Sequence, residues 1–446
     1  MRTVILDGTS NDGSYSAGDL SQQVGEQFKA DLEQLNYQVD LFRLGEIKIA
    51  DCLGDFKCWV KTPGICAIDD ANREIAQAVA QSELLVFITP VTFGGYSSHL
   101  KKAVDHLIQN ISPNFQKMQG ETHHQKRYAR YPGLIGIGLL PAEDPQAERL
   151  FQSLLYRNAL NFHAPYLASA FIYQRQLQAD LGLSGLAFSS GLLAQAASPA
   201  GLGPPPGGTP GLLEVASGER WVAQEKRALL LVGSPRGPKS TSASLGGFLC
   251  DRLADSGWEI ETVDLVPALR KAARFQELLA DMERASLVVL SSPLYVDSFP
   301  APVIRALERF AEHRQVTVPR RGQGLSVLLN CGFPEAAHNA TALQIARRFA
   351  CESGFTWAGG LAMGGGESIH GKPLAELGGM ASNIRRSLEL AAKALGKGDP
   401  LPAEAVVLMA EPLLPPWMYR LFGGYGWRQQ ARGYGAQRRL GARPYK

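Results

Sequence analysis

The chain has 446 residues, of which 45% are apolar and 20% charged, and its formal net charge is +3. This is an ordinary globular composition, and so small a charge gives no strong electrostatic signal for a partner. The first predicted strand begins directly after Met1, which argues against a signal peptide. No apolar run approaches the roughly 20 residues of a membrane-spanning helix, so we expect a cytoplasmic protein.

Apolar runs alternate with helical patterns along both halves of the chain. The first half predicts strands at residues 2–7, 37–42, 84–89, 133–139 and 166–173, and helices at residues 17–35, 68–81, 97–110 and 144–161. The second half predicts strands at residues 228–233, 258–264, 286–292, 324–330 and 355–362, and helices at residues 241–256, 272–284, 300–313, 337–353 and 375–395. Such alternation implies an α/β protein with two doubly wound, five-stranded parallel sheets in tandem.

The two halves also repeat each other in sequence. Residues 84–107 align without a gap on residues 287–310, so that Pro90 falls on Pro293. Each copy is an unbroken apolar run, a proline corner, a polar-aromatic loop and a helix. Unbroken apolar runs are typical of parallel strands covered on both faces, and open α/β sheets bind ligands beyond the carboxyl ends of such strands. The repeat therefore predicts two domains of one fold, each with a candidate site.

Spacing within the repeat identifies an insert in the first half. Gly8 and Pro90 are 82 positions apart, whereas Gly233 and Pro293 are 60 apart, so the first copy carries 22 extra residues. The extra residues fall around positions 46–66. The insert contains three of the six cysteines of the chain, Cys52, Cys58 and Cys66.

Four parts follow from these patterns. The predicted parts are a first domain at residues 1–175, a linker at 176–227, a second domain at 228–395 and a tail at 396–446. Residues 196–211, at the centre of the linker, contain no charge and almost no side chain that builds a core.

The tail is basic and aromatic. From Trp417 onward it has seven Lys or Arg and seven aromatic residues, and after Glu411 it has no acidic residue. Two interpretations stay open: a surface for nucleic acid or anionic lipid, or an arm that packs through its aromatic residues. The dispersed basic residues favour the arm, and we expect no nucleic-acid partner.

A loop rich in Gly, Ser and Thr joins the first strand of the second half to the following helix. Residues 233–242 read GSPRGPKSTS. The unpaired N–H groups of a helix N-terminus and the hydroxyls bind phosphate oxygens, and Arg236 or Lys239 can neutralise the charge. The loop matches neither the dinucleotide fingerprint nor the nucleoside-triphosphate loop. The alternative is that the hydroxyls of residues 240–242 only cap the helix.

This loop, together with the later SSPLYVDSFPAPV, resembles the flavodoxin-like NAD(P)H-dependent FMN reductases over residues 228–395. The resemblance implies that the FMN phosphate is held by Ser234, Arg236, Ser240, Thr241 and Ser242. It implies that the isoalloxazine ring is contacted by Pro293, Leu294, Tyr295 and Val296. A second ring-side loop is implied after the fourth strand, formed by Cys331, Gly332, Phe333, Pro334 and Glu335.

The first half, residues 1–175, resembles the same superfamily. The implied ring-side residues are Pro90, Val91, Thr92, Phe93 and Gly94. Its phosphate loop, residues 8–14, supplies Thr9 and Ser10 but no basic residue. Asp12 and Asp19 are poorly placed for a phosphate. Lys101 and the run HHQKRY at residues 123–128 are candidates for the missing positive charge.

The cysteine insert resembles that of flavodoxin-family proteins related to iron–sulfur flavoproteins. Relatives with a cluster use four cysteines, and Asp55 stands where we expect the second ligand. We therefore predict no metal, while Cys52, Cys58 and Cys66 remain candidate cluster ligands. The alternative is three small, semi-buried residues in a loop. His123, His124 and His163 lack the spacing of a metal site, and His99 is better placed to touch a substrate.

The resemblance implies an FMN-dependent oxidoreductase with NAD(P)H as co-substrate. The implied acceptor is a small molecule, either a quinone, a flavin, an azo compound or a nitro compound, and no catalytic side chain is assigned. A flavodoxin-type electron carrier is the first alternative, although the charge of +3 differs from the acidic surfaces of flavodoxins. The second is that one half is a non-catalytic pairing module, within a homo-oligomer or an intramolecular pseudo-dimer. The phosphate loop without a basic residue favours this for the first half.

Overall fold

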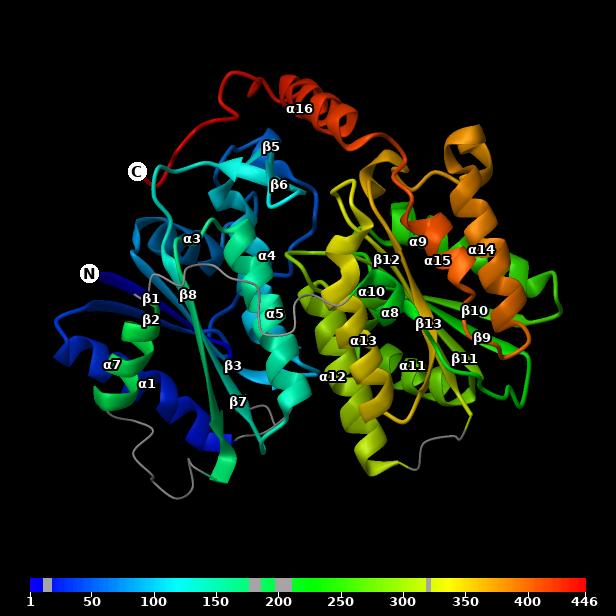
Figure 1. Ribbon diagram of the computed structural model, residues 1–446, viewed down its shortest axis with the longest axis horizontal. Coiled ribbons are helices and arrows are strands. Elements are labelled where there is room, and N and C mark those ends of the chain that lie inside the picture. Colours follow the sequence, from blue (N-terminus) through cyan, green and yellow to red (C-terminus); the bar gives the residue numbers. More distant parts are fainter. Residues whose placement is uncertain (11–17, 176–185, 197–210, 318–321) are drawn as a thin grey trace. The chain divides into compact units, whose positions relative to one another are not determined.

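The computed structural model describes residues 1–10, 18–175, 186–196, 211–317 and 322–446 (Figure 1). Its contacts divide the chain into two units. Unit 1 comprises Met1–Gly208 and Arg420–Lys446, and unit 2 comprises Thr209–Tyr419. The centre of the predicted linker, residues 197–210, lies outside the described residues.

Unit 1 is built on a parallel sheet. Its strands are β1 (Arg2–Asp7), β2 (Gln38–Arg43), β3 (Leu84–Thr92), β7 (Gly133–Leu140) and β8 (Leu167–Tyr173), in the order β2-β1-β3-β7-β8. A short strand, β4 (Gly95–Tyr96), pairs antiparallel with the end of β3. The central strands β3 and β7 are buried along almost their whole length, as expected when helices cover both faces of a parallel sheet.

Helices cover both faces of this sheet (Figure 1). One face carries α1 (Gly18–Gln34) and α7 (Leu186–Ala196), whose Phe28 and Leu192 join the same apolar core as Ile5 and Ile137 of the strands. The other face carries α3 (Ala71–Gln81), α4 (Ser98–His106) and α5 (Pro145–Asn161). Two shorter helices are α2 (Lys57–Val60), within the cysteine insert, and η1 (Leu107–Asn110), directly after α4.

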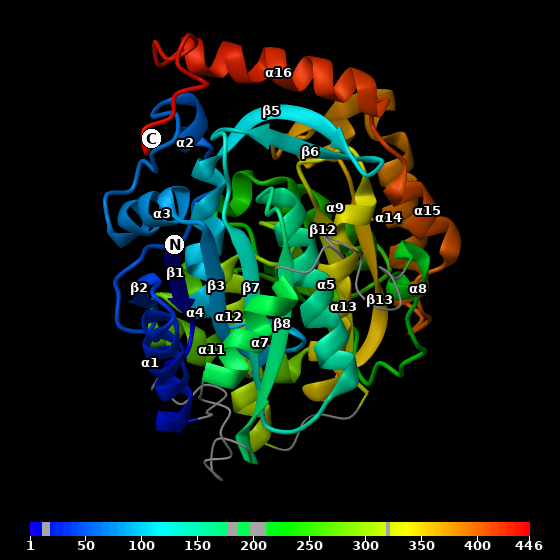
Figure 2. The ribbon, with the colours of Figure 1, turned by 60° about the vertical axis from the view of Figure 1, so that its left-hand side comes forward.

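A β-hairpin follows directly after η1 in unit 1. Its strands, β5 (Ile111–Met118) and β6 (Glu121–Lys126), form a separate two-stranded sheet. These strands were not predicted, because the run HHQKRY lacks the apolar alternation that marks a half-buried strand. Figure 2 shows the hairpin beside α16 (Pro416–Arg432).

Unit 2 repeats the topology of unit 1. Its strands are β9 (Arg227–Val232), β10 (Glu259–Asp264), β11 (Leu287–Pro293), β12 (Gly324–Asn330) and β13 (Thr356–Met363), in the order β10-β9-β11-β12-β13. All neighbouring pairs in this sheet are parallel. Both sheets therefore have the flavodoxin-like order 2-1-3-4-5, which confirms the predicted fold class.

Helices also cover both faces of the second sheet (Figure 1). One face carries α9 (Thr241–Ala254), α14 (Ser382–Leu395) and α15 (Ala403–Ala410), and the other carries α11 (Ala272–Arg284), α12 (Ala301–Val316) and α13 (Ala340–Glu352). The shorter helices are α8 (Leu212–Ala216), α10 (Leu265–Leu269), η2 (Gly237–Lys239), η3 (Ala336–Asn339), η4 (Gly366–Ser368) and η5 (Leu374–Ala381). Both α7 and α8 fall within residues 176–227, which the composition predicted as linker.

All ten predicted strands are present, two of them with the predicted bounds and the others with ends shifted by one to three residues. The last predicted helix, at residues 375–395, is divided into η5 and α14. Within η5 itself, Gly378 adopts φ 55° and ψ −138°, a conformation that no α-helix contains, so one continuous helix over residues 375–395 is not possible. Among the described residues, no helix combines the length and the apolarity that a membrane span requires.

Residues 420–446 of the tail pack within unit 1. The indole of Trp427 lies edge-on to Phe56 and Trp59, with ring centroids 5.2 and 5.3 Å apart. The buried Arg127 donates from Nη1 to the carbonyl oxygens of Leu440 (3.1 Å) and Ala442 (2.7 Å). These contacts agree with the interpretation of the tail as an arm that packs through its aromatic residues.

Candidate functional site

The candidate site of unit 2 lies where the strand order reverses. Strand β9 pairs with β10 on one side and with β11 on the other, and β11 pairs in turn with β12. The carboxyl ends of neighbouring parallel strands meet at one edge of the sheet, and ligands of open α/β sheets bind at this reversal. The loops that leave these strands hold the residues predicted for FMN.

Equivalent glycines begin the first loop in both units. The N–H of Gly233 donates to Ser291 O (2.8 Å), and the N–H of Gly8 donates to Ile88 O (2.7 Å). A Cβ on Gly233 would lie 2.8 Å from Val303 Cγ2, at the start of α12, and a Cβ on Gly8 would lie 2.6 Å from Leu100 Cβ of α4. Glycine is therefore required in both loops, because the following helix crosses too closely for a side chain.

The phosphate loop of unit 2, residues 233–240, turns tightly into α9. Gly237 has φ 58° and begins the short helix η2, and the Ser240 hydroxyl caps α9 by accepting from Ala243 N (3.1 Å). The cap orients the N-terminus of a 14-residue helix toward the loop. The backbone thus provides the donors and the dipole that a phosphate needs.

The hydroxyls of the phosphate loop are engaged within the protein. Ser240 Oγ donates to Gly237 O (2.6 Å), and Thr241 Oγ1 donates to Gly366 O (2.7 Å). Ser242 Oγ accepts from Asn330 Nδ2 (2.9 Å), and Ser234 Oγ accepts from Arg236 N (3.3 Å). Each hydroxyl has one proton to donate, so Ser240 and Thr241 contribute to the loop through their backbone and their hydroxyls hold its shape.

Arg236 supplies the positive charge of this loop. Its guanidinium forms a two-point ion pair with Glu367, in which Nη1 lies 3.3 Å from Oε2 and Nη2 bonds Oε1. Both side chains are about one-third exposed, at 31% and 32%. Sequence reasoning identified Arg236 but missed Glu367, which follows the fifth strand.

The ring-side turn after β11 contains two non-glycine residues in the left-handed region. Val296 has φ 43° and Asp297 has φ 62°, and the turn is closed by Tyr295 N–H donating to Ser298 O (2.8 Å). A β-branched residue in this region is a genuine outlier, and such residues cost about 1–3 kcal/mol each. Backbone strain of this kind gathers at ligand-binding sites, and here it falls on the predicted Val296.

The second ring-side loop, residues 331–335, holds a buried thiol. Cys331 Sγ lies 3.3 Å from Phe333 O and 3.5 Å from Glu335 O. Burial raises the pKa of Cys331 to about 12, so the thiol stays protonated and neutral at physiological pH. The hydroxyl of Tyr419 donates to Gly332 O and thereby holds this loop from outside.

A glycine loop that the sequence analysis missed connects these parts. It comprises residues 364–367 (GGGE), directly after β13. Gly365 N–H donates to Phe333 O (2.7 Å), and Gly366 N–H donates to Cys331 O (2.8 Å). A Cβ on Gly364 would lie 2.1 Å from Pro334 O, which no side chain permits. In the sequence, three consecutive glycines at the end of a predicted strand could have indicated this loop.

Asn330 also connects the parts of the site, from the end of β12. Its Nδ2 donates to Ser242 Oγ (2.9 Å) and to Ser292 O (3.2 Å), and its carbonyl accepts from Leu294 N (2.8 Å). Asn330 therefore ties these parts together, because its side-chain amide binds the start of α9 and the end of β11 while its backbone carbonyl binds the ring-side loop. A polar residue at the end of an apolar run was visible in the sequence, but its partners were not.

Unit 1 has the equivalent ring-side turn. Phe93 (φ 50°) and Gly94 (φ 78°) form it, with Val91 paired to Tyr96 and Thr92 paired to Gly95. The Thr92 hydroxyl is buried and has no hydrogen-bond partner among the described residues. The turn is thus present in both copies of the repeat. In unit 1, the hydroxyl of the predicted ring-side residue Thr92 is left without a hydrogen bond among the described residues.

The phosphate loop of unit 1 contains a carboxylate. Asp7 ends β1 and is 1% exposed; its Oδ1 accepts from Thr9 N (2.9 Å) and from Thr9 Oγ1 (2.7 Å). Burial raises the pKa of Asp7 to about 6, partly offset by these two hydrogen bonds. At this position unit 2 has Val232. Ser10 follows, whereas Asp12 and the side chain of Asp19 lie outside the described residues.

The basic residues proposed to neutralise a phosphate in unit 1 instead bind groups of the protein itself. Lys101 is 1% exposed and pairs with Asp105 one turn along α4. Arg127 donates to Ile111 O (3.1 Å) and to the tail carbonyls. His123 is fully buried, and burial lowers the pKa of His124 to about 3 and that of His163 to about 4. His124 and His163 are therefore neutral at physiological pH, and all three histidines are buried or half-buried rather than in solvent.

The clustered cysteines are free thiols. Burial raises the pKa of Cys52 to about 12 and raises the pKa of Cys58 well above the ordinary value of a thiol. Cys66 Sγ lies 3.6 Å from His106 Nδ1, and Asp55 pairs with Lys57 at 2.9 Å. Within the described residues, no three His, Cys, Asp or Glu side chains gather as a metal-binding set.

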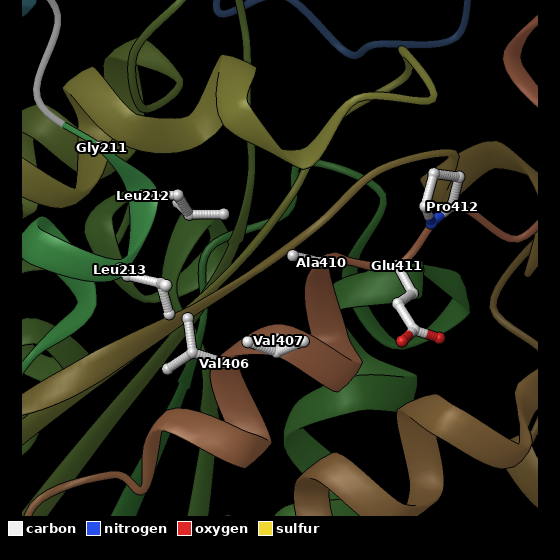
Figure 3. Close-up of a pocket in the computed structure, with 8 residues that line it drawn as sticks. All are labelled: Gly211, Leu212, Leu213, Val406, Val407, Ala410, Glu411 and Pro412. Carbon is white, nitrogen blue, oxygen red and sulfur yellow. The ribbon is translucent and has the colours of Figure 1, made fainter.

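A shallow groove elsewhere in unit 2 contains none of the predicted residues (Figure 3). Its volume is about 470 Å³. It is lined by Gly211, Leu212, Leu213, Val406, Val407, Ala410, Glu411 and Pro412. One carboxylate on an otherwise apolar lining offers nothing to a phosphate, so the groove is not a flavin phosphate site.

Comparison with known proteins places the chain among flavin enzymes. The NADPH-dependent FMN reductase family matches residues 1–130 and 227–322. One structural match is an azoreductase from Bacillus anthracis str. Sterne, with 16% identity over 38% of this chain and 99% of that chain and a TM-score of 0.28. Another is an NAD(P)H:quinone oxidoreductase from Methanothermobacter marburgensis, with 17% identity over 39% of this chain and 98% of that chain and a TM-score of 0.28. No curated protein sequence matches.

Proposed function

The chain belongs to the NADPH-dependent FMN reductase family, which matches just over half of its length in two parts, and we propose that unit 2 holds its working flavin site. The protein is a flavin-dependent NAD(P)H oxidoreductase, with FMN as cofactor and NAD(P)H as co-substrate. The location of the flavin and the nature of the final acceptor are our proposals.

One observation carries the choice of unit 2. At the reversal of its strand order, a loop with an arginine at a helix N-terminus lies beside a strained turn. The residues fit FMN, because the turn at Gly237 leads into the N-terminus of α9 and Arg236 provides a planar fork for a phosphate. Pro293, Leu294, Tyr295 and Val296 would flank the ring, and residues 331–333 would form its second side.

When bound, FMN supplies the redox chemistry, taking hydride from NAD(P)H and passing electrons to an acceptor. The residues of unit 2 bind, orient and shield. Backbone N–H groups of the ring-side loops are suited to stabilise negative charge on the ring, and the neutral Cys331 adds no nucleophile. A small-molecule acceptor that reaches the ring would take the electrons: a quinone, an azo or nitro compound, or a free flavin.

Unit 1 fits a flavin phosphate poorly. The amide and hydroxyl of Thr9 already donate to the Asp7 carboxylate, which lies where an incoming phosphate needs donors. Above pH 6 this carboxylate is ionised and repels a dianion. We therefore propose that unit 1 is a flavin-free pairing module and that the chain binds one FMN.

The deciding experiment is a titration of the purified full chain with FMN, followed by anaerobic addition of NADPH or NADH. We expect one flavin per chain and bleaching of its visible absorption band by at least one nicotinamide. Two flavins per chain would contradict the assignment of unit 1. A bound flavin that both nicotinamides leave oxidised would support the electron carrier, and no binding would refute the flavin site.

A further inference from the structure

The Arg236–Glu367 pair is a feature of unit 2 that the proposed function leaves unexplained. The guanidinium of Arg236 presents two donors to the two oxygens of Glu367. This planar fork is the geometry by which arginine binds either a carboxylate or a phosphate. The family resemblance assigns Arg236 to the FMN phosphate. In the structure, this cation is already paired with Glu367, an anion of the protein itself.

The backbone holds Glu367 in this position from two sides. The preceding Gly366 donates to Cys331 O (2.8 Å), and its own carbonyl accepts from Thr241 Oγ1 (2.7 Å). Farther along, Gly371 packs so closely that a Cβ would lie 2.3 Å from Lys239 O of the phosphate loop. These contacts hold the backbone that carries Glu367 against the phosphate loop, within reach of Arg236.

The charges around the loop are balanced. Arg236 and Lys239 are its cations, while Glu367 pairs with Arg236, and Asp264 Oδ1 lies 3.9 Å from the position of a Cβ on Gly237. A phosphate that enters this loop meets an arginine whose charge is neutralised. To form its own two-point contact, the phosphate must share or displace the Glu367 carboxylate.

We propose that Glu367 competes with the flavin phosphate for Arg236 and so weakens the binding of FMN selectively. This inference rests on the proposed location of the flavin in unit 2. Riboflavin carries the same ring and ribityl chain without the phosphate, so Glu367 leaves its affinity unchanged. The consequence is a site that distinguishes FMN from riboflavin only weakly and from which the flavin exchanges readily.

The test is fluorescence titration of the full chain with FMN and with riboflavin, before and after Glu367→Gln. The amide keeps the shape of the side chain and removes its charge. We expect the Kd for FMN to fall about fivefold, the upper range for a partly exposed ion pair, with no change for riboflavin. The matched control is Glu259→Gln, which breaks the two-point pair between Arg227 and Glu259 at the opposite, amino-terminal edge of the same sheet and should change neither Kd.

Each other result has a distinct meaning. Weaker FMN binding by the Glu367→Gln variant would overturn the proposal, because it would show that Glu367 holds Arg236 in place for the phosphate. An equal change for FMN and riboflavin would also overturn it, since the effect would then lie at the ring. If the unchanged chain bound neither flavin, the proposed function itself would fail, whereas unchanged FMN binding by the variant would refute only the role of Glu367.

Discussion

The buried carboxyl of Asp7 predicts a pH-dependent penalty on the stability of unit 1, and Asp7→Asn should remove it. Burial raises the pKa of Asp7 from 3.8 to about 6 in the folded state. A raised pKa means that the folded state binds the proton more tightly than the unfolded state. The penalty is therefore absent below pH 3.8, grows as the pH rises through the interval from 3.8 to 6, and is complete above it.

The size of this penalty follows from the pKa difference, which corresponds to ~3 kcal/mol above pH 6. Asn keeps an oxygen that accepts from Thr9, but its amide nitrogen replaces Oδ2, which has no partner among the described residues. A buried, unpaired donor costs about 1–3 kcal/mol at every pH. The informative quantity is therefore the change in the variant's relative stability between two pH values, not its stability at one.

We would measure urea unfolding of the original chain and of Asp7→Asn at pH 4 and at pH 7.5. The free energy of unfolding of the variant, relative to the original, should rise by ~2.5 kcal/mol between the two pH values. Asp40→Asn is the control, because Asp40 lies in a half-exposed pair with Arg2 and should show less than ~1 kcal/mol of such change. Parallel pH profiles for Asp7→Asn and the original chain would refute the reasoning.

Three further predictions concern the flavin site, the tail and the thiols. Arg236→Gln should weaken FMN binding by no more than about fivefold and leave riboflavin binding unchanged in the same titration, because Glu367 already pairs with this guanidinium and a partly exposed ion pair contributes at most about 1 kcal/mol. Trp427→Ala should lower the free energy of unfolding by ~3 kcal/mol, because the indole is 8% exposed, whereas Trp417→Ala, at 62% exposed, should change it by less than ~0.5 kcal/mol in urea unfolding. A thiol reagent should modify the exposed Cys351 first and the buried Cys58 only after denaturation, as peptide mapping would show.

The sequence was sufficient for the strands because the signal is local. A run such as LLVFIT at residues 84–89 has one stable environment, the interior of a parallel sheet, and both copies of the repeat carry it. The tight turns were also accessible, since Gly233 and Gly94 stand at corners where a side chain or a negative φ is excluded. Periodicity and turn chemistry therefore defined the sheet and its loops.

The sequence did not show in the same way which side-chain groups of the site are free to bind a ligand. Ser240 and Thr241 have the chemistry of phosphate ligands, but whether a hydroxyl proton is available depends on carbonyls contributed by distant segments, such as Gly366. The same holds for Asp7, whose carboxylate accepts from Thr9 only because β1 ends with its side chain turned inward. Residue types indicate what a loop can bind, whereas tertiary contacts decide which of its groups remain available.

The composition of unit 1 from two separated segments has a consequence for synthesis. Arg127 donates hydrogen bonds to the backbone carbonyls of residues 440 and 442. The rings of Phe56 and Trp59 pack against the indole of Trp427. Because domains fold as the ribosome delivers them, the first domain to emerge cannot be completed until residues 420–446 have been made. The whole of unit 2 is therefore translated before unit 1 has its last segment. A frameshift near position 420 would damage unit 1, although most of unit 1 is translated first.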